Sequence, residues 1–212
     1  MKTYAIVPVH EFSVGKTRLG RALRKKERAE LSLAMMSDVL DALCRSRELE
    51  RVVLVTRDAD ATCAALMRGA MVLWEGHSHG LNRAVRRGIR FAEREGADQV
   101  LIIPADIPLA KPADIARILR EGRKSDVTIV PSYDDGGTNA LLLRPPRVIP
   151  VSYGRSSYRR HCRLARNRTV RLRILRLPSL QLDIDRPLDL KRACAASGNT
   201  RSQLLLRKLV GH

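Results

Sequence analysis

The chain has 212 residues, of which 44% are hydrophobic and 29% charged, which predicts one folded domain and excludes a disordered chain. Its 40 Lys and Arg residues against 22 Asp and Glu give a net charge of +18, which attracts anions, and its 3% aromatic content favours small phosphorylated ligands over nucleic acid. The sequence lacks an apolar run of the ~20 residues that span a membrane, and its N-terminus is typical of a strand rather than a signal peptide, so we expect a cytoplasmic protein.

Strands and amphipathic helices alternate in the first part of the chain. Short apolar runs predict buried strands, and apolar residues at helical spacing predict the helices between them. The expected elements are, in order, strand 3–9, helix 27–45, strand 52–56, helix 59–68, strand 70–74, helix 81–92, strand 100–103, helix 112–120 and strand 127–130. This order predicts a doubly wound, mostly parallel α/β sheet.

The pattern changes after a turn at 134–137. We expect an antiparallel strand at 139–143, a helix at 156–165, an edge strand at 170–175, a helix that begins at Pro187 and a short helix at 203–209. The chain then consists of a single domain, residues 1–197, followed by a basic tail, residues 198–212.

The loop after the first strand carries Lys16 and Arg18. Gly15 and Lys16 suggest a phosphate-binding P-loop, but that motif needs a further glycine where this chain has His10. Open α/β sheets bind ligands at the carboxyl ends of their strands. Lys16 and Arg18 could therefore hold a triphosphate, and a solvated surface loop is the alternative.

Three aspartates are candidates for a metal site. Asp106 directly follows an apolar strand, and Asp183 and Asp185 are two residues apart, so that they point to the same side of an extended chain. Carboxylates this close favour a bound cation, and oxygen ligands suit Mg²⁺. The alternative is that Asp106 caps a turn and that one of the pair caps the helix at Pro187.

Weaker signals lie in three loops, at 76–82, 136–139 and 153–157. Asn82, in the loop 76–82, could hydrogen-bond a base edge, and Ser157 lies near a helix N-terminus, which suits an anion. Each loop could also be a simple turn. The cysteines and histidines are too scattered for a zinc site. His77 and His79 are close together, but no carboxylate or cysteine cluster accompanies them.

Taken in order, these segments resemble the 2-phospho-L-lactate guanylyltransferase family of coenzyme F420 biosynthesis. The matching segments are 6–9, 15–19, 34–40, 80–82, 104–108, 135–141, 153–154 with Ser157 and His161, and 182–187. The resemblance implies a glycosyltransferase-A-like nucleotidyltransferase fold, GTP as donor and Mg²⁺ as cofactor. It also implies an acceptor that is 2-phospho-L-lactate, phosphoenolpyruvate or 3-phospho-D-glycerate, and the release of pyrophosphate.

The resemblance also implies roles for individual residues. The metal ligands would be Asp106, Asp183 and Asp185; the catalytic residues Asp106, Lys16 and Arg18; the nucleotide-binding residues Lys16, Arg18, Gly80, Asn82 and Asp106; and the acceptor-binding residues Thr138, Gly154 and Ser157.

Two alternative functions remain at this point. A sugar-phosphate or molybdopterin nucleotidyltransferase shares the fold, but such enzymes carry a glycine-rich loop after the first strand, where this chain has only Gly15. A basic RNA-binding module is disfavoured by the few aromatic residues and the three aspartates. Base rates favour a homodimer.

Overall fold

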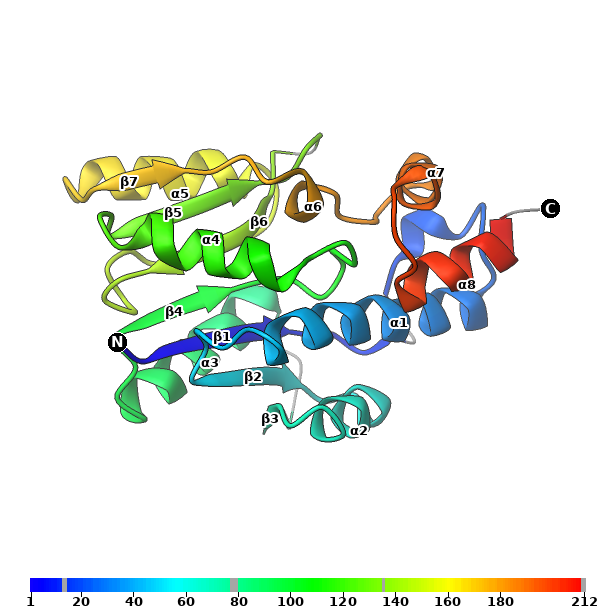
Figure 1. The fold of residues 1–212 in the computed structure, drawn as a ribbon, viewed down its shortest axis with the longest axis horizontal. Coiled ribbons are helices and arrows are strands. Elements are labelled where there is room, and N and C mark those ends of the chain that lie inside the picture. The colour runs from blue at the N-terminus through cyan, green and yellow to red at the C-terminus, as the bar shows by residue number, and fades with distance from the viewer. Residues whose placement is uncertain (13–14, 77–79, 135, 211–212) are drawn as a thin grey trace.

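The computed structural model describes residues 1–12, 15–76, 80–134 and 136–210, and these residues form one mixed sheet of seven strands (Figure 1). The strands are β1 (Thr3–Pro8), β2 (Arg51–Thr56), β3 (Met71–Trp74), β4 (Gln99–Ile102), β5 (Val127–Pro131), β6 (Thr138–Leu143) and β7 (Leu172–Ile174). Their order in the sheet is β3-β2-β1-β4-β6-β5-β7. Only β6 among the described strands runs antiparallel to its neighbours, β4 and β5, so the expected sheet is confirmed.

Helices cover both faces of the sheet. The helical elements are η2 (Thr17–Leu19), α1 (Lys25–Cys44), α2 (Ala59–Leu66), α3 (Leu81–Arg94), α4 (Pro112–Gly122), α5 (Ser157–Asn167), α6 (Pro178–Gln181), α7 (Pro187–Ala195) and α8 (Arg201–Val210). In β1, Ala5 and Val7 pack under α1, whereas Tyr4 and Ile6 pack with α3. This alternation explains why the strand is apolar throughout, because each face meets a helix layer.

A close approach between α3 and β1 requires glycine at position 88. A Cβ atom added to Gly88 would lie 2.6 Å from Cγ2 of Ile6, which is too close for two carbon atoms. The absence of a side chain therefore brings the start of α3 near the carboxyl end of β1.

The C-terminal segment packs against the rest of the protein. α7 and α8 lie beyond the carboxyl ends of the parallel strands, next to α1 (Figure 1). Leu206 of α8 is fully buried in a third core cluster that also contains Leu19, Met35 and Leu190. α8 is longer than the helix expected at 203–209, β7 is shorter than the expected strand, and the short α6 was not expected.

Asp38 of α1 binds the N-terminus of α8. Its carboxylate accepts hydrogen bonds from the backbone N–H groups of Arg201, at 3.0 Å, and Ser202, at 2.9 Å, and from the Ser202 hydroxyl, at 2.5 Å. A negative charge at this end of a helix satisfies its unpaired N–H groups and its dipole.

We predict that Asp38→Ala lowers the free energy of unfolding by about 2 kcal/mol, because α8 loses its cap. Urea denaturation measures the loss. Asp41→Ala in the same helix, which removes more exposed ion pairs with Arg68 and Arg201, should cost less than about 1 kcal/mol. Equal losses in the two variants would show that capping is not the cause.

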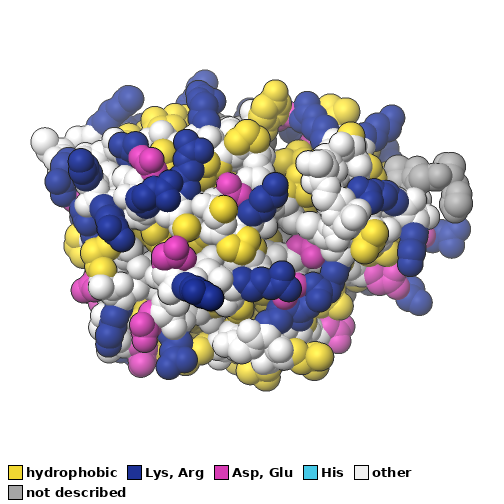
Figure 2. All heavy atoms as spheres, viewed as in Figure 1, with side chains coloured by type: hydrophobic (Ala, Val, Ile, Leu, Met, Phe, Trp, Pro, Cys, Tyr) yellow, Lys and Arg dark blue, Asp and Glu magenta, His cyan; other side chains and the backbone are white. Residues whose placement is uncertain are grey.

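The positive charge is spread over the surface. Lys and Arg side chains are scattered across the whole visible face in Figure 2, among fewer acidic ones. On this face the charge does not form one continuous stripe of the kind that tracks a nucleic acid backbone. None of the helices in the described part of the chain has the length and apolar character needed to cross a membrane.

Candidate active site

Lys16, Asp106 and Asp185 meet at the carboxyl ends of β1 and β4. The Lys16 ammonium donates to Oδ2 of Asp106 at 2.6 Å and to Oδ1 of Asp185 at 2.7 Å. β1 and β4 are parallel neighbours, which places the loops that follow them side by side. The backbone N–H of Ile184 donates to the Asp106 carbonyl at 3.0 Å and so fixes the chain that carries Asp185. The three side chains line a cavity of about 260 Å³.

The charges in this cluster hold one another ionised. Burial alone would lower the pKa of Lys16, but the Asp106 and Asp185 carboxylates raise that pKa to about 12. Burial would raise the pKa of Asp185, yet Lys16, Arg18 and Arg186 lower it below its usual range. The Arg18 guanidinium lies 3.8 Å from Asp185, and its side chain is 67% exposed. Arg18 is therefore an exposed cation beside Asp185, and it lines a smaller cavity next to this one.

Asp183 lies apart from the Lys16 cluster. Its Oδ1 accepts hydrogen bonds from Oγ of Ser132 at 2.8 Å and from Nδ2 of Asn139 at 3.1 Å. Asp183, Asp185 and Arg18 line a neighbouring cavity of about 50 Å³. Within the residues that the structure describes, no three His, Cys, Asp or Glu side chains come together in a way that could hold a metal ion. Of the three aspartates, the structure thus brings Asp106 and Asp185 together around Lys16 and places Asp183 next to them.

The Asp106–Asp185 pair suits a hard cation. Two carboxylate oxygens converge on one point, and that point holds a charged ammonium group. Mg²⁺ is likewise a compact positive charge, and its sites in proteins provide oxygen ligands. Mg²⁺ binding at these two residues stays a prediction.

A second group of polar side chains surrounds Thr138 at the start of β6. Ser157 Oγ donates to Thr138 Oγ1 at 3.2 Å, and His161 Nδ1 lies 3.1 Å from the same oxygen. The backbone N–H of Ser152 donates to His161 Nε2 at 2.9 Å, so the neutral imidazole carries its proton on Nδ1. Thr138 Oγ1 therefore accepts two hydrogen bonds, and its own proton is left to donate.

Arg160 and Gly154 lie beside this group. Nε and Nη2 of Arg160 are buried and have no hydrogen-bond partner in the described part of the chain. Gly154 has φ 116°, which disfavours other residues, and a Cβ atom there would lie 3.1 Å from Arg160 Nη2. Two buried guanidinium nitrogens without hydrogen-bond partners are costly, and an anion bound at this loop would reduce that cost.

Asn82 of α3 holds the loop that carries Gly154. Its Nδ2 donates to the Tyr153 carbonyl at 3.0 Å, and its Oδ1 accepts from the Tyr153 N–H at 2.7 Å. The side-chain amide thus positions the loop of Tyr153 and Gly154, and its contact with a base stays a prediction. Gly80 precedes α3 with φ 82°, a conformation that suits glycine.

Comparisons with known proteins bear on this arrangement. Residues 3–211 match a family model described as guanylyl transferase CofC like. The chain belongs to the CofC-like guanylyltransferase family. The family expected from the sequence motifs is thereby confirmed.

Relatives of this CofC-like chain match it along almost its whole length. The phosphoenolpyruvate guanylyltransferase of Rubrobacter xylanophilus is 41% identical over 200 residues, which cover 93% of this chain and 96% of the relative. The 2-phospho-L-lactate guanylyltransferase of Methanothermobacter thermautotrophicus is 36% identical over 209 residues, which cover 99% and 92%. A solved nucleotidyl transferase from Methanothermobacter thermautotrophicus superposes with a TM-score of 0.68 at 20% identity, over 98% of this chain and 99% of that chain, which supports the fold.

The sequence analysis assigned no role to two residues near Thr138. Arg160 is one of many arginines in its segment, so nothing in the sequence distinguishes it. His161 is part of a matching motif, but its role follows only from its two hydrogen bonds. His77 and His79, for which no zinc site is expected, and Asp135 of one matching segment lie outside the described residues.

The buried His161 makes stability depend on pH. Burial, and then the nearby Arg160, lowers the pKa of His161 from 6.5 to about 4. The stability from neutral His161 is complete above the unfolded pKa and is lost as the pH falls through about 4. Between pH 7 and pH 4 we expect wild type to lose about 3 kcal/mol more unfolding free energy than His161→Gln. Equal losses in urea denaturation would contradict this.

Proposed function

We propose that the chain transfers guanylate from GTP to the phosphate of a small phosphorylated carboxylic acid and releases pyrophosphate. The observation that carries this proposal is the meeting of Lys16, Asp106 and Asp185 at the carboxyl ends of β1 and β4. Family membership supports the guanylyl donor. We place phosphoenolpyruvate first as acceptor, because the more similar of the two relatives above bears that name, with 2-phospho-L-lactate next and 3-phospho-D-glycerate third.

The donor half of the site has to hold a triphosphate. Lys16 in the larger cavity and Arg18 in the neighbouring one would offset the negative charge of GTP. Asp106 and Asp185 would hold Mg²⁺, whose charge, when it is bound, polarises the α-phosphate. Asp183 lines the smaller cavity with Asp185, and its Oδ1 accepts hydrogen bonds from Ser132 and Asn139. Gly80 and Asn82 flank Leu81 at the start of α3, and Leu81 lines the cavity of the donor half.

The transfer step needs no side-chain nucleophile. An oxygen of the acceptor phosphate attacks the α-phosphorus, a new P–O bond forms, and the bond to the β-phosphate oxygen breaks as pyrophosphate leaves. The acceptor phosphate is already an anion at neutral pH, so a general base is not required. The protein has to bring two polyanions together, which requires cations on both sides of the site.

The acceptor half of the site provides hydrogen-bond donors. Thr138 has its hydroxyl proton to give, and Ser157 lies at the start of α5, where backbone N–H groups favour an anion. Arg160 adds a positive charge next to Gly154. Both the phosphate and the carboxylate of a phosphorylated acid accept hydrogen bonds, so the acceptor's chemistry matches these groups.

We predict that Thr138→Val raises KM for the acceptor about tenfold and leaves KM for GTP unchanged, because one donated hydrogen bond is lost. Thr138→Ser keeps the hydroxyl and should stay close to wild type. Steady-state kinetics with each substrate varied in turn measures both constants. An unchanged acceptor KM in Thr138→Val would remove Thr138 from the acceptor half.

The reaction itself is tested by pyrophosphate release. Purified protein receives Mg²⁺ and GTP together with phosphoenolpyruvate, 2-phospho-L-lactate or 3-phosphoglycerate, with ATP and CTP as donor controls. Release that needs GTP and one acid supports the proposal and identifies the acceptor. No release from folded protein with any of the acids would reject it. A place in coenzyme F420 biosynthesis, a cytoplasmic location and a homodimer stay predictions.

A further inference from the structure

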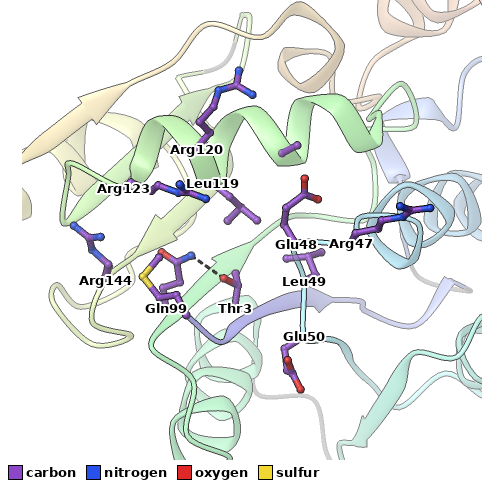
Figure 3. Close-up of a pocket in the computed structure, with 12 residues that line it drawn as sticks. Thr3, Arg47, Glu48, Leu49, Glu50, Gln99, Leu119, Arg120, Arg123 and Arg144 are labelled. Carbon is purple, nitrogen blue, oxygen red and sulfur yellow. Dashed lines mark hydrogen bonds between the residues drawn. The ribbon is translucent and has the colours of Figure 1, made fainter.

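A third cavity opens at the other end of the sheet from Lys16. It has a volume of about 770 Å³ and lies at the amino ends of β1 and β4, where Thr3 and Gln99 form part of its wall (Figure 3). Because β6 runs antiparallel to β4, the end of β6 also reaches this edge and brings Arg144 to the cavity. Arg123 arrives from the end of α4.

Two arginines give this cavity an anion-binding wall. Arg123 and Arg144 lie on the same side of the cavity as Gln99 in Figure 3. Neither guanidinium makes a salt bridge with a carboxylate in the described part of the chain. Other arginines on this protein do so, such as Arg171 with Asp126 and Arg147 with Glu93. Arg171 lowers the pKa of the Asp126 carboxylate, and Arg144 helps to lower it without forming a salt bridge with Asp126. Two cations without a salt bridge at one cavity wall suit a phosphate group.

Gln99 supplies an independent indication of a ligand. The residue is only 2% exposed, and its Nε2 donates to Thr3 Oγ1 at 2.7 Å. Its Oε1 is buried and has no hydrogen-bond partner among the residues that the structure describes. A buried amide oxygen is normally satisfied, so an unpaired one at a cavity wall calls for a donor from the ligand. Glu48, across the cavity in Figure 3, offers further acceptor oxygens.

We propose that this cavity is a second ligand site that binds a phosphorylated polyol of the ribose phosphate type. Its phosphate contacts Arg123 and Arg144, and its hydroxyl groups donate to Gln99 Oε1 and to the Glu48 carboxylate. The cavity is large enough for such a molecule. A free sugar phosphate and the ribose phosphate of a nucleotide share this chemistry. The proposal does not depend on the guanylyl transfer proposed above, because no residue is common to the two sites.

Calorimetric titration of the whole chain tests the site with ribose 5-phosphate, GMP and inorganic phosphate as probes. Wild type should bind ribose 5-phosphate at one site and more tightly than inorganic phosphate. The double variant Arg123→Gln with Arg144→Gln should weaken the binding of ribose 5-phosphate and of inorganic phosphate at least about tenfold, since it removes two phosphate contacts. The matched control Arg86→Gln with Arg90→Gln removes the same charge from exposed positions on α3 and should bind like wild type.

A second variant separates the hydroxyl contact from the charge. Gln99→Met keeps the approximate size of the side chain and removes the unpaired oxygen, so it should weaken ribose 5-phosphate and leave inorganic phosphate unchanged. Circular dichroism and pyrophosphate release report whether each variant is folded. GMP binding stronger than that of ribose 5-phosphate, and sensitive to Arg123 and Arg144, would name a nucleotide as the source. No ribose 5-phosphate binding to wild type, or equal losses in the two double variants, would overturn the proposal.

Discussion

Asp106→Asn is expected to lower the turnover of guanylyl transfer by about two to three orders of magnitude and to leave the fold intact. The Asp106 carboxylate accepts from the Lys16 ammonium at 2.6 Å and is one of the two acids that converge there. An asparagine keeps the shape but loses the charge that would bind Mg²⁺ and orient Lys16. The backbone bond from Ile184 to the Asp106 carbonyl does not involve the side chain, so the chain that carries Asp185 should stay in place.

The measurement is pyrophosphate release at saturating substrates, with thermal unfolding as the check on folding. Glu93→Gln is the matched control, because it also removes one carboxylate. That carboxylate pairs with Arg147 and takes no part in the Lys16 cluster. Turnover near wild type in Asp106→Asn would remove Asp106 from the catalytic residues. A similar loss in Glu93→Gln would show that net charge, and not the site, sets the rate.

Lys16→Met is expected to have two opposite effects. Transfer should fall about a hundredfold or more, because the cation nearest both carboxylates is lost. Binding of Mn²⁺ to the nucleotide-free protein should become tighter, because the ammonium no longer occupies the point at which Asp106 and Asp185 converge. Electron paramagnetic resonance of added Mn²⁺ measures this affinity without any turnover.

Lys25→Met controls for the lost charge, since Lys25 is exposed at the start of α1. Tighter Mn²⁺ binding in Lys16→Met alone would support a site that lysine and metal occupy in turn. Unchanged Mn²⁺ binding in Lys16→Met would contradict a metal site at Asp106 and Asp185, whatever happens to the rate.

The sequence predicted the sheet well because local and long-range signals agree there. β4 is an apolar strand with helices on both faces, so its hydrophobic run and its place before Asp106 could be recognised directly. β7 was harder to predict, because only three residues pair at the edge with β5, although the alternating pattern extends further. The length of pairing there depends on the neighbouring strand, which the local pattern does not contain.

The site could be predicted only in part. Asp183 and Asp185 both line the smaller cavity, but their spacing in the sequence does not tell which neighbours each one meets. In the structure, Lys16 donates a hydrogen bond to Asp185, whereas Ser132 and Asn139 donate to Asp183. These partners come from segments far away in the sequence. The hydrogen-bond chain from His161 to Thr138 depends on tertiary packing in the same way.

The third core cluster has a consequence for how this protein can evolve. Leu19, which immediately follows Arg18, is fully buried in the same cluster as Leu206 of the last helix. The loop that presents Lys16 and Arg18 therefore rests on residues of α8, which lie far away from it in the sequence. Loss of α8 would therefore disturb the loop of Lys16 and Arg18 as well as the stability of the protein. Natural selection on catalysis should thus constrain the last helix, although none of its side chains belongs to either half of the site.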